Sequence, residues 1–309
     1  MPGAVFLPAT QGGRVRRALV LSLLVAAALP LVARQRSAVE DSTSLDAVVA
    51  AAVAYVNGYQ RELTAILADE EYRQQIHGQT PREETMPRLR TLQSEVFFMY
   101  APGSDWMAIR DVLSQNGKAI KDRPNLREAL RTLPPDEVAR TFKRYNSRFN
   151  LGRIVRNFNE PTLSLLLLAD RYRPHVTFER RRVQKRADGV WVTIAAKEAR
   201  VPDTLIQDLS RTPVPSIGEF VVHATSGRIS QAILRTTLGA VRAELTTEYA
   251  PDVRLGMWVP TRFIEHYLEG GRGQVGSDPR TRIQTQFEEI RSVADYRNYR
   301  RFEVKVTIK

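Results

Sequence analysis

Residues 241–249 read VRAELTTEY, and this stretch decides the fold class of the chain. Its odd-numbered positions carry Val, Ala, Leu, Thr and Tyr, whereas its even-numbered positions carry Arg, Glu, Thr and Glu. Successive side chains of a β-strand point to opposite faces, so a period of two gathers the apolar residues on one face. This pattern is typical of an antiparallel sheet with one face on a core and the other in water.

Similar runs of alternating or β-branched residues recur on both sides of this stretch. Asn116-Gly117, Asp188-Gly189 and Ser226-Gly227 separate several of them, and these dipeptides favour the tight turns of hairpins. The predicted strands span residues 69–76, 89–100, 106–115, 118–120, 176–185, 190–197, 220–224, 229–236, 241–249, 255–259, 262–268, 282–290 and 301–308. We therefore expect one strongly curved antiparallel sheet of about ten strands.

A long helix is predicted before the first strand. Thr43 and Ser44 can cap its start, and apolar residues then recur at steps of four and three. This apolar stripe consists of Leu45, Val49, Ala52, Val56, Tyr59, Leu63 and Ile66. Flanking apolar residues widen the stripe, as is typical of a helix that lies against a sheet, and the alternative is a coiled-coil partner.

A helical insert is predicted over residues 122–170, between the first and the later strands. Its clearest helix spans residues 135–149, with Pro135 at the start and two acidic residues in the first turn. Leu163 to Leu168 follow, with five leucines in six residues. A run this apolar is expected to be buried or to lie in a groove.

These elements predict an α+β fold. The long N-terminal helix and the helical insert pack on a curved antiparallel sheet that resembles half of a barrel. Neither a linker nor an internal repeat interrupts residues 44–309, so we expect a single domain there.

The N-terminal segment predicts export. Arg14, Arg16 and Arg17 precede the apolar residues 18–33, and this order is typical of a secretory signal peptide. The apolar run is shorter than the roughly 20 residues that span a bilayer, and the alternative is a retained N-terminal anchor. We therefore expect a signal peptide over residues 1–33, a flexible start over residues 34–43, and a periplasmic or secreted protein.

The composition limits the chemistry of the protein. The sequence has no cysteine, which excludes disulfide bonds, thiol catalysis and cysteine-bound metals. Its formal net charge is +12, and most of its 46 basic residues are arginines. The densest basic cluster consists of Arg180, Arg181, Arg182, Lys185 and Arg186. We expect either a solvated strand and turn there or a contact with an anionic membrane surface, and export argues against nucleic acid as a partner.

Motifs for catalysis are lacking. The sequence has no zinc-protease motif, no nucleophile elbow and no Ser-x-x-Lys, which favours a protein that is not an enzyme. Gly271-x-Gly273-x-x-Gly276 matches a dinucleotide fingerprint only by letter, because no helix start follows it. His223 and His266 could meet across the sheet, but a metal usually needs three or four ligands. Neither a metal nor another cofactor is therefore predicted.

Two acidic segments are candidates for general acid and base catalysis. Asp69, Glu70 and Glu71 are predicted to form a solvated turn after the long helix. Glu288 and Glu289 are neighbours on a predicted strand, where they would point to opposite faces and could not share a substrate. Neither segment is therefore predicted to be a catalytic site.

Several segments resemble a family of uncharacterised exported bacterial proteins of acidobacterial type. The matching segments are residues 52–76, 104–123, 144–168, 190–206, 247–260 and 294–304, which read AVAYVNGYQRELTAILADEEYRQQI, SDWMAIRDVLSQNGKAIKDR, RYNSRFNLGRIVRNFNEPTLSLLLL, VWVTIAAKEARVPDTLI, TEYAPDVRLGMWVP and ADYRNYRRFEV. The family's usual Asp-Pro-x-Thr-Gly hairpin is replaced here by residues 224–227, which keep the glycine. The resemblance implies no activity for any residue. At the level of fold alone, the chain is similar to periplasmic lipoprotein carriers and envelope-stress regulators, whose half-barrels hold acyl chains or partner peptides.

We expect an exported, non-enzymatic binding protein that holds a lipid, an acyl group or a segment of an envelope protein partner in an apolar concavity. The alternatives are a structural or regulatory envelope protein that acts through a surface patch, and a hydrolase whose site has no motif. The predicted ligand-contact residues are Leu163, Leu165, Leu166, Leu167, Leu168, Trp106, Trp191 and Trp258.

Overall fold

The computed structural model describes residues 43–78, 87–100, 106–154, 160–208, 210–270 and 288–302. The chain divides into two units, residues 1–44 and 45–309, and the description below concerns the second. Five sequence predictions lie wholly or partly outside the described residues. They are the signal peptide, the flexible start except for Thr43, the glycine motif of residues 271–276, the strand of residues 282–290 before Glu288, and the strand of residues 301–308 beyond Phe302.

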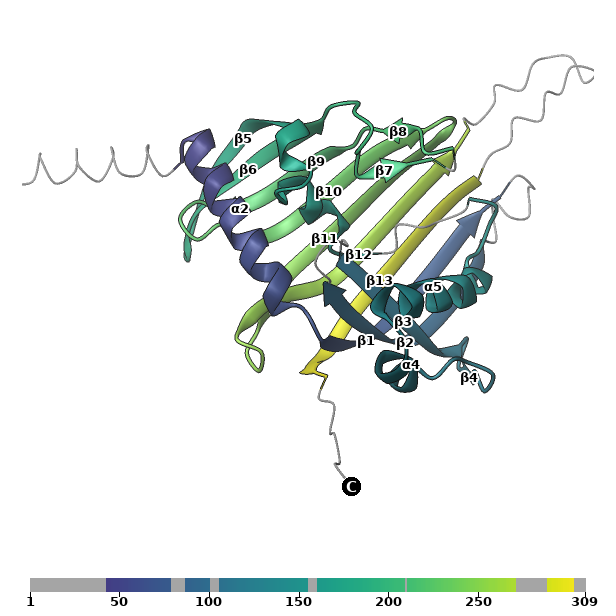
Figure 1. Ribbon diagram of the computed structural model, residues 1–309. Helices are drawn as coiled ribbons and strands as arrows, with labels where there is room; N and C mark the ends of the chain where they lie inside the picture. The colour runs from purple at the N-terminus through teal and green to yellow at the C-terminus, as the bar shows by residue number, and fades with distance from the viewer. Residues whose placement is uncertain are drawn as a thin grey trace, which may run out of the picture. The chain divides into compact units, whose positions relative to one another are not determined.

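An antiparallel sheet of eleven strands dominates the structure (Figure 1), in the order β4-β3-β2-β1-β13-β12-β11-β10-β9-β6-β5. The strands are β1 (Ile66–His77), β2 (Arg88–Tyr100), β3 (Trp106–Gln115), β4 (Lys118–Ala119), β5 (Val176–Arg186), β6 (Gly189–Glu198), β9 (Ile217–His223), β10 (Ile229–Leu238), β11 (Val241–Asp252), β12 (Met257–Glu269) and β13 (Glu288–Arg301). A separate pair comprises β7 (Ile206–Gln207) and β8 (Pro213–Val214). The sheet is curved and open, which confirms the predicted α+β, half-barrel-like fold class.

One face of the sheet, here called the inner face, carries the main core. Residues paired directly across antiparallel strands share a face, so Tyr72, Ala294 and Phe263 lie side by side across β1, β13 and β12. Helix α2 (Leu45–Glu62) packs on this core through one apolar side. The buried residues of that side are Val48, Ala52, Val56 and Tyr59.

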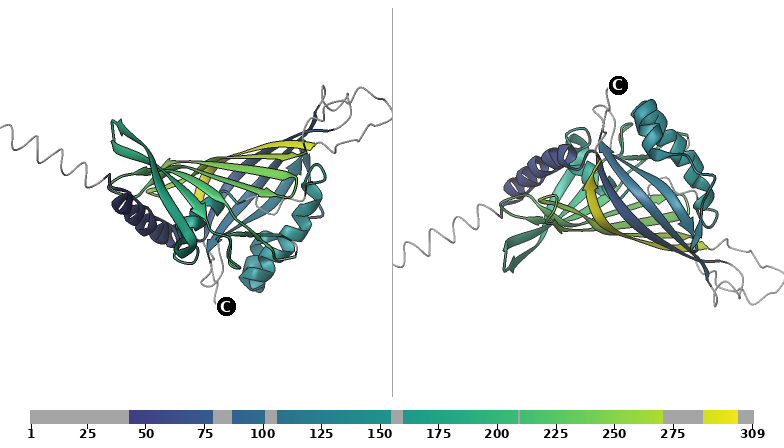
Figure 2. Two further views of the ribbon diagram at one scale, coloured as in Figure 1. Left: turned by 90° about the horizontal axis from the view of Figure 1, so that it is seen from above. Right: turned by 90° about the horizontal axis from the view of Figure 1, so that it is seen from below.

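The opposite, outer face carries a second core where β1, β2 and β3 lie together. Leu67, Phe97 and Ile109 are paired across these strands, and they pack against α4 (Leu126–Thr132) and α5 (Pro135–Asn146). Val138 and Phe142 of α5 are buried there. Strands β1 to β3 are therefore covered on both faces. Figure 2 shows α2 and the α4–α5 pair at opposite ends of the sheet.

The leucine run forms part of the main core. Residues Leu163–Leu168 fold as a 3₁₀ helix, η2, in which Leu165 to Leu168 are at most 1% exposed. A Cβ on Gly218 would lie only 2.8 Å from Leu167 Cδ1, so η2 sits close above β9. Two further 3₁₀ turns are η1 (Ser147–Phe149) and η3 (Arg173–His175).

The structure corrects the predicted start of the sheet. Helix α2 ends at Glu62 rather than near Ile66, and Ala65 adopts a left-handed φ of 59° that turns the chain into β1. Asp69 to Glu71 are not a solvated turn, because β1 already begins at Ile66 and runs through them. The strand predicted over residues 69–76 is therefore present, but it begins three residues earlier than predicted.

Two later strands also differ from the prediction. The sequence predicts separate strands over residues 255–259 and 262–268, but β12 is continuous through Pro260, where a register shift accommodates the missing N–H. No strand is predicted over residues 291–300, yet β13 runs through them. Its inner-face residues include Ser292 and Ala294, which are too small or polar to give an apolar pattern. Within the described part of the chain, no helix has the length and apolar character needed to cross a membrane.

Candidate functional site

A cavity of about 350 Å³ lies beside α5, at the β3 end of the large sheet. Strand β4 pairs with β3 only at Ser114 and Gln115, so along the rest of this edge β3 contacts α5. Consecutive residues of β3 line the cavity, which therefore follows the edge of the strand. The lining residues are Tyr72, Gln74, Leu92, Met107, Ala108, Ile109, Arg110, Val112, Asp136, Ala139, Arg140, Phe142, Lys143, Asn146, Ser147, Phe149, Asn150 and Glu160.

Much of the cavity wall is apolar and buried. Leu92 and Val112 belong to the inner face of the sheet, Phe149 follows α5, and all three are at most 4% exposed. Phe142 adds a buried aromatic ring from α5. Such a wall gives water few hydrogen-bond partners, and it favours an apolar ligand group.

Arg110 brings a buried charge to the cavity, but Glu70 neutralises it. Arg110 Nε and Nη2 donate to the two carboxylate oxygens of Glu70 at 2.5 and 2.7 Å, and its guanidinium lies 4.9 Å from the centre of the Tyr72 ring. Burial alone would lower the pKa of Arg110, yet the charge and hydrogen bonds of Glu70 raise it above its ordinary value. Arg110 is thus committed to Glu70 rather than to a ligand.

Hydrogen bonds from Gln74 hold the segment after α5 against the inner face. Gln74 Nε2 donates to the backbone oxygen of Phe149 at 2.9 Å, and Leu151 N donates to Gln74 Oε1 at 3.2 Å. Arg90 Nη1 donates to the same Phe149 oxygen at 2.8 Å. These bonds fix one wall of the cavity independently of any ligand.

Asn146 lies where α5 crosses the edge of β3. Its Nδ2 donates to the backbone oxygen of Arg110 at 2.6 Å, so the side chain takes the place of a neighbouring strand. Its Oδ1 is buried and has no hydrogen-bond partner among the described residues. A buried acceptor of this kind is costly unless it is satisfied, so Asn146 Oδ1 is a point where a ligand or a water molecule could donate.

The rim of the cavity carries exposed charges from α5. Arg140 Nη1 lies 2.7 Å from Asp136 Oδ2, an exposed pair one helical turn apart. Lys143 follows on the same side of the helix and makes no ion pair with any described residue. The cavity lining therefore includes one positive charge, Lys143, that makes no ion pair with a described residue, and one further acidic residue, Glu160, next to an apolar interior.

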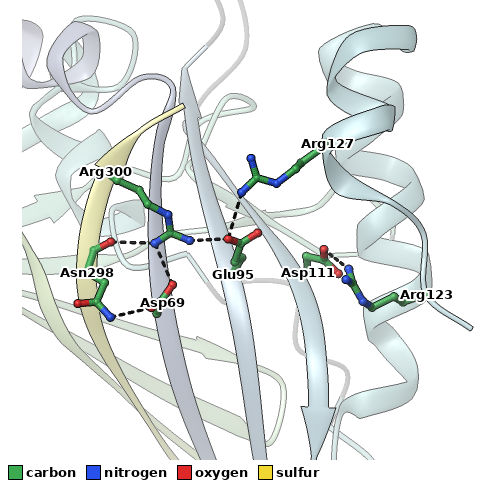
Figure 3. Close-up of polar contacts among 7 residues, drawn as sticks. All are labelled: Asp69, Glu95, Asp111, Arg123, Arg127, Asn298 and Arg300. Atoms are coloured by element: carbon green, nitrogen blue, oxygen red, sulfur yellow. Dashed lines mark hydrogen bonds and ion pairs between the residues drawn. The ribbon is translucent and has the colours of Figure 1, made fainter. Parts of the chain in front are cut away.

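A second polar cluster, shown in Figure 3, lies on the outer face and does not line the cavity. Arg300 donates to Asp69 Oδ1 at 2.8 Å and also to Glu95, which Arg127 contacts at 3.5 Å. Each of these charges has a partner of opposite sign. The cluster thus links β13, β1, β2 and α4 and is structural.

Figure 3 also shows Asp111, which forms an ion pair with Arg123. Arg123 donates to its Oδ2, while its Oδ1 is buried without a hydrogen-bond partner in the described part of the chain. Burial raises the pKa of Asp111, and Arg123 offsets this only in part. The carboxylate is therefore held at a cost in stability.

None of the predicted ligand-contact residues lines this cavity. The leucines of η2 lie in the main core, Trp106 packs against Tyr59 at 5.7 Å, and Trp191 lies 5.9 Å from Trp258. The leucines and Trp106 thus belong to or pack on the same main core, Trp258 packs against that core, and Trp191 contacts Trp258. The role predicted for them as ligand contacts remains a prediction.

The sequence analysis did not identify the residues that do line the cavity. One signal was available, because Arg110 stands at an inward-facing position between Ala108 and Val112. A charge at such a position indicates a buried partner. No sequence pattern indicates that α5 borders a cavity, since its polar side resembles any solvated helix face.

The other titratable groups singled out by the sequence are separated. His223 on β9 contacts Asp188 and Ser226, whereas His266 on β12 contacts Glu289 at 2.8 Å. The described residues contain no group of three or more potential metal ligands. Glu288 is buried and Glu289 is not, in line with their predicted opposite faces.

The sequence matches no protein-family model and no curated protein. Two solved structures have folds similar to the fold of this chain. One is described as an outer membrane lipoprotein-sorting protein domain from Vibrio parahaemolyticus, with 8% identity, a TM-score of 0.38, and coverage of 80% of this chain and 91% of that chain. The other is a DUF1329 family protein from Desulfovibrio piger, with 9% identity, a TM-score of 0.34, and coverage of 84% and 95%. The first agrees with the resemblance to lipoprotein carriers at the level of fold, and both likenesses concern the fold alone.

Proposed function

We propose that this protein is an exported, non-enzymatic binding protein for an acyl-chain amphiphile with an anionic head. The acyl chain would occupy the cavity beside α5, and the head would lie at its rim. The observation that carries the proposal is the combination of a buried apolar wall with the unpaired Lys143 at the mouth.

The size of the cavity supports a small-molecule ligand. Ligand pockets commonly span roughly 300–1,000 Å³, and the cavity of about 350 Å³ lies at the lower end of this range. A single acyl chain fits this size better than a folded partner segment. Buried methylene groups would supply most of the binding free energy, at about 0.8 kcal/mol each.

The polar groups at the mouth support an anionic head. Lys143 makes no ion pair with a described residue, Asp136 pairs with Arg140, and Glu160 is the other acidic residue that lines the cavity surface. A carboxylate or phosphate near Lys143 would gain a charge-assisted hydrogen bond. Asn146 Oδ1 would accept a donor from the head or from an ordered water molecule.

Isothermal titration of the purified protein with fatty acids that differ by two methylene groups tests the proposal. Each two-carbon extension should strengthen binding about tenfold until the cavity is full. Binding that does not depend on chain length, or no binding at all, would contradict the proposal.

Replacing Lys143 tests the position of the head. Lys143→Ala should weaken binding about tenfold, because a charge-assisted hydrogen bond is lost. Arg144→Ala removes the same charge from the next residue of α5, which does not line the cavity, and it should change binding less than twofold. Equal effects of both variants would place the head elsewhere.

A further inference from the structure

The far end of the sheet carries a feature that the cavity does not use. Strand β5 is the last strand of the eleven and pairs only with β6. From Glu179 onward, nearly every residue of β5 is exposed. We name its five basic residues the basic edge: Arg180, Arg181, Arg182, Lys185 and Arg186.

Part of the charge of the basic edge, on Arg182 and Lys185, is uncompensated among the described residues. Glu179 is the one acidic residue of β5, and its Oε2 lies 3.0 Å from Arg181. Arg182 and Lys185 make no ion pair with any residue that the structure describes. Two positive charges without an ion pair therefore stand close together on the exposed part of a strand that pairs with a neighbouring strand on one side alone.

The pairing of β5 with β6 spreads this charge around the strand. A register shift at Arg181 places Arg180 opposite Ile194 and Arg182 opposite Thr193. Ile194 and Thr193 are neighbours on β6, so their side chains point to opposite faces. Basic side chains thus flank both sides of the free edge, which suits contact with an extended anionic surface rather than with a single small anion.

Aromatic and apolar side chains lie at the same end. The Trp191 and Trp258 rings are 5.9 Å apart, and Arg186 lies over the Trp191 ring at 4.8 Å. The contact between Trp191 and Trp258 brings the β5–β6 turn close to the β11–β12 turn. In the β11–β12 turn, Val253 is 94% exposed and Arg254 follows it. Trp191 is only 1% exposed, so the side chains of this end that favour a membrane interface are the exposed Val253 and the basic residues.

We infer that the basic edge, together with the β11–β12 turn, docks the protein on an anionic lipid surface. A positively charged strand edge complements a layer of phosphate-bearing headgroups, and Val253 adds an apolar contact at the interface. Each basic residue near such a surface strengthens binding roughly fivefold, and salt screens the effect. This inference is independent of what the cavity binds.

Sedimentation of the full chain with lipid vesicles tests the inference. The protein should bind vesicles that contain phosphatidylglycerol several-fold more tightly than pure phosphatidylcholine vesicles, and high salt should remove the difference. Arg180→Gln, Arg182→Gln and Lys185→Gln combined should weaken binding to the anionic vesicles by about a hundredfold. If the apolar residues 18–33 bound the vesicles instead, binding would persist on neutral vesicles and in this variant, and this outcome would contradict the inference.

A matched variant separates position from net charge. Lys121→Gln, Arg131→Gln and Arg144→Gln remove three exposed charges near α4 and α5, and together they should change vesicle binding only slightly. Equal weakening by both triple variants, or equal binding to both kinds of vesicle, would overturn the inference. Binding to polyglutamate without binding to anionic vesicles would also overturn it, and would assign the basic edge to an acidic protein segment.

Discussion

Arg110 and Glu70 form a buried, two-pronged ion pair on the inner face of β3 and β1. Two hydrogen bonds, at 2.5 and 2.7 Å, join the guanidinium to both carboxylate oxygens, and Arg110 is 8% exposed while Glu70 is 1% exposed. Taking charges out of water is costly, so each residue depends on the other. The pair also borders the cavity, because Arg110 forms part of the cavity wall.

The ion pair gives the first prediction. Arg110→Met should lower the free energy of unfolding by about 3–5 kcal/mol, because it leaves the Glu70 carboxylate buried without a partner. The double variant Glu70→Leu/Arg110→Met should recover most of this loss. Urea unfolding of the single and double variants measures the coupling, and additive effects would show that the pair does not interact.

The leucine run gives the second prediction. Leu167→Ala should lower the free energy of unfolding by about 3 kcal/mol, since Leu167 is fully buried in the main core. Leu238→Ala removes the same atoms from a half-exposed position and should cost less than about 1 kcal/mol. A Leu167→Ala variant that keeps its stability but loses the ligand would instead support a direct ligand contact.

Two glycines allow a matched comparison. Gly227 and Gly239 have similar positive φ values of 69° and 58°, but a Cβ on Gly227 would lie 1.9 Å from the Ala51 backbone oxygen, whereas one on Gly239 meets nothing within 4 Å. Gly239→Ala should cost about 1 kcal/mol of conformational strain. Gly227→Ala should cost about 1–3 kcal/mol more, because the β9–β10 turn must move away from α2. Similar thermal unfolding of both variants would exclude the close contact.

Asp111 gives a prediction about pH. Its pKa is raised in the folded state, so its contribution to stability is full below the unfolded pKa of about 3.9 and is lost as the pH rises through the folded value. Asp111→Asn should therefore gain stability relative to the wild type as the pH increases from about 4 to 6. Urea unfolding across this range checks the sign, and parallel curves for the two proteins would refute it.

Much of the sheet could be predicted from the sequence because its strands alternate. β11 has charged residues on one face and apolar residues on the other, and Asn-Gly or Ser-Gly turns mark the hairpins. β1 and β13 were harder, because their inner faces carry Glu70, Gln74 and Ser292. Glu70 and Gln74 bind partners that lie far along the chain, and local pattern carries no information about such partners.

The cavity could not be predicted for a related reason. It depends on α5 lying across the edge of β3, and on the length of the connection that places Phe149 beneath Leu92 and Val112. Each segment alone resembles an ordinary amphipathic helix or strand. Only their placement, which Asn146 secures through the Arg110 backbone, creates the space.

The pairing of β1 with β13 has a consequence for how this sheet assembles. Residues 66–77 meet residues 288–301 in the middle of the sheet, between β2 and β12. Until residues 288–301 arrive, β1 and β12 each present an unpaired edge, and the central contact must close a loop of more than 200 residues. Folding is therefore expected to be slow and to be limited by the pairing of the last strand. Any chain that ends before β13 would expose two unpaired strand edges, which favour aggregation.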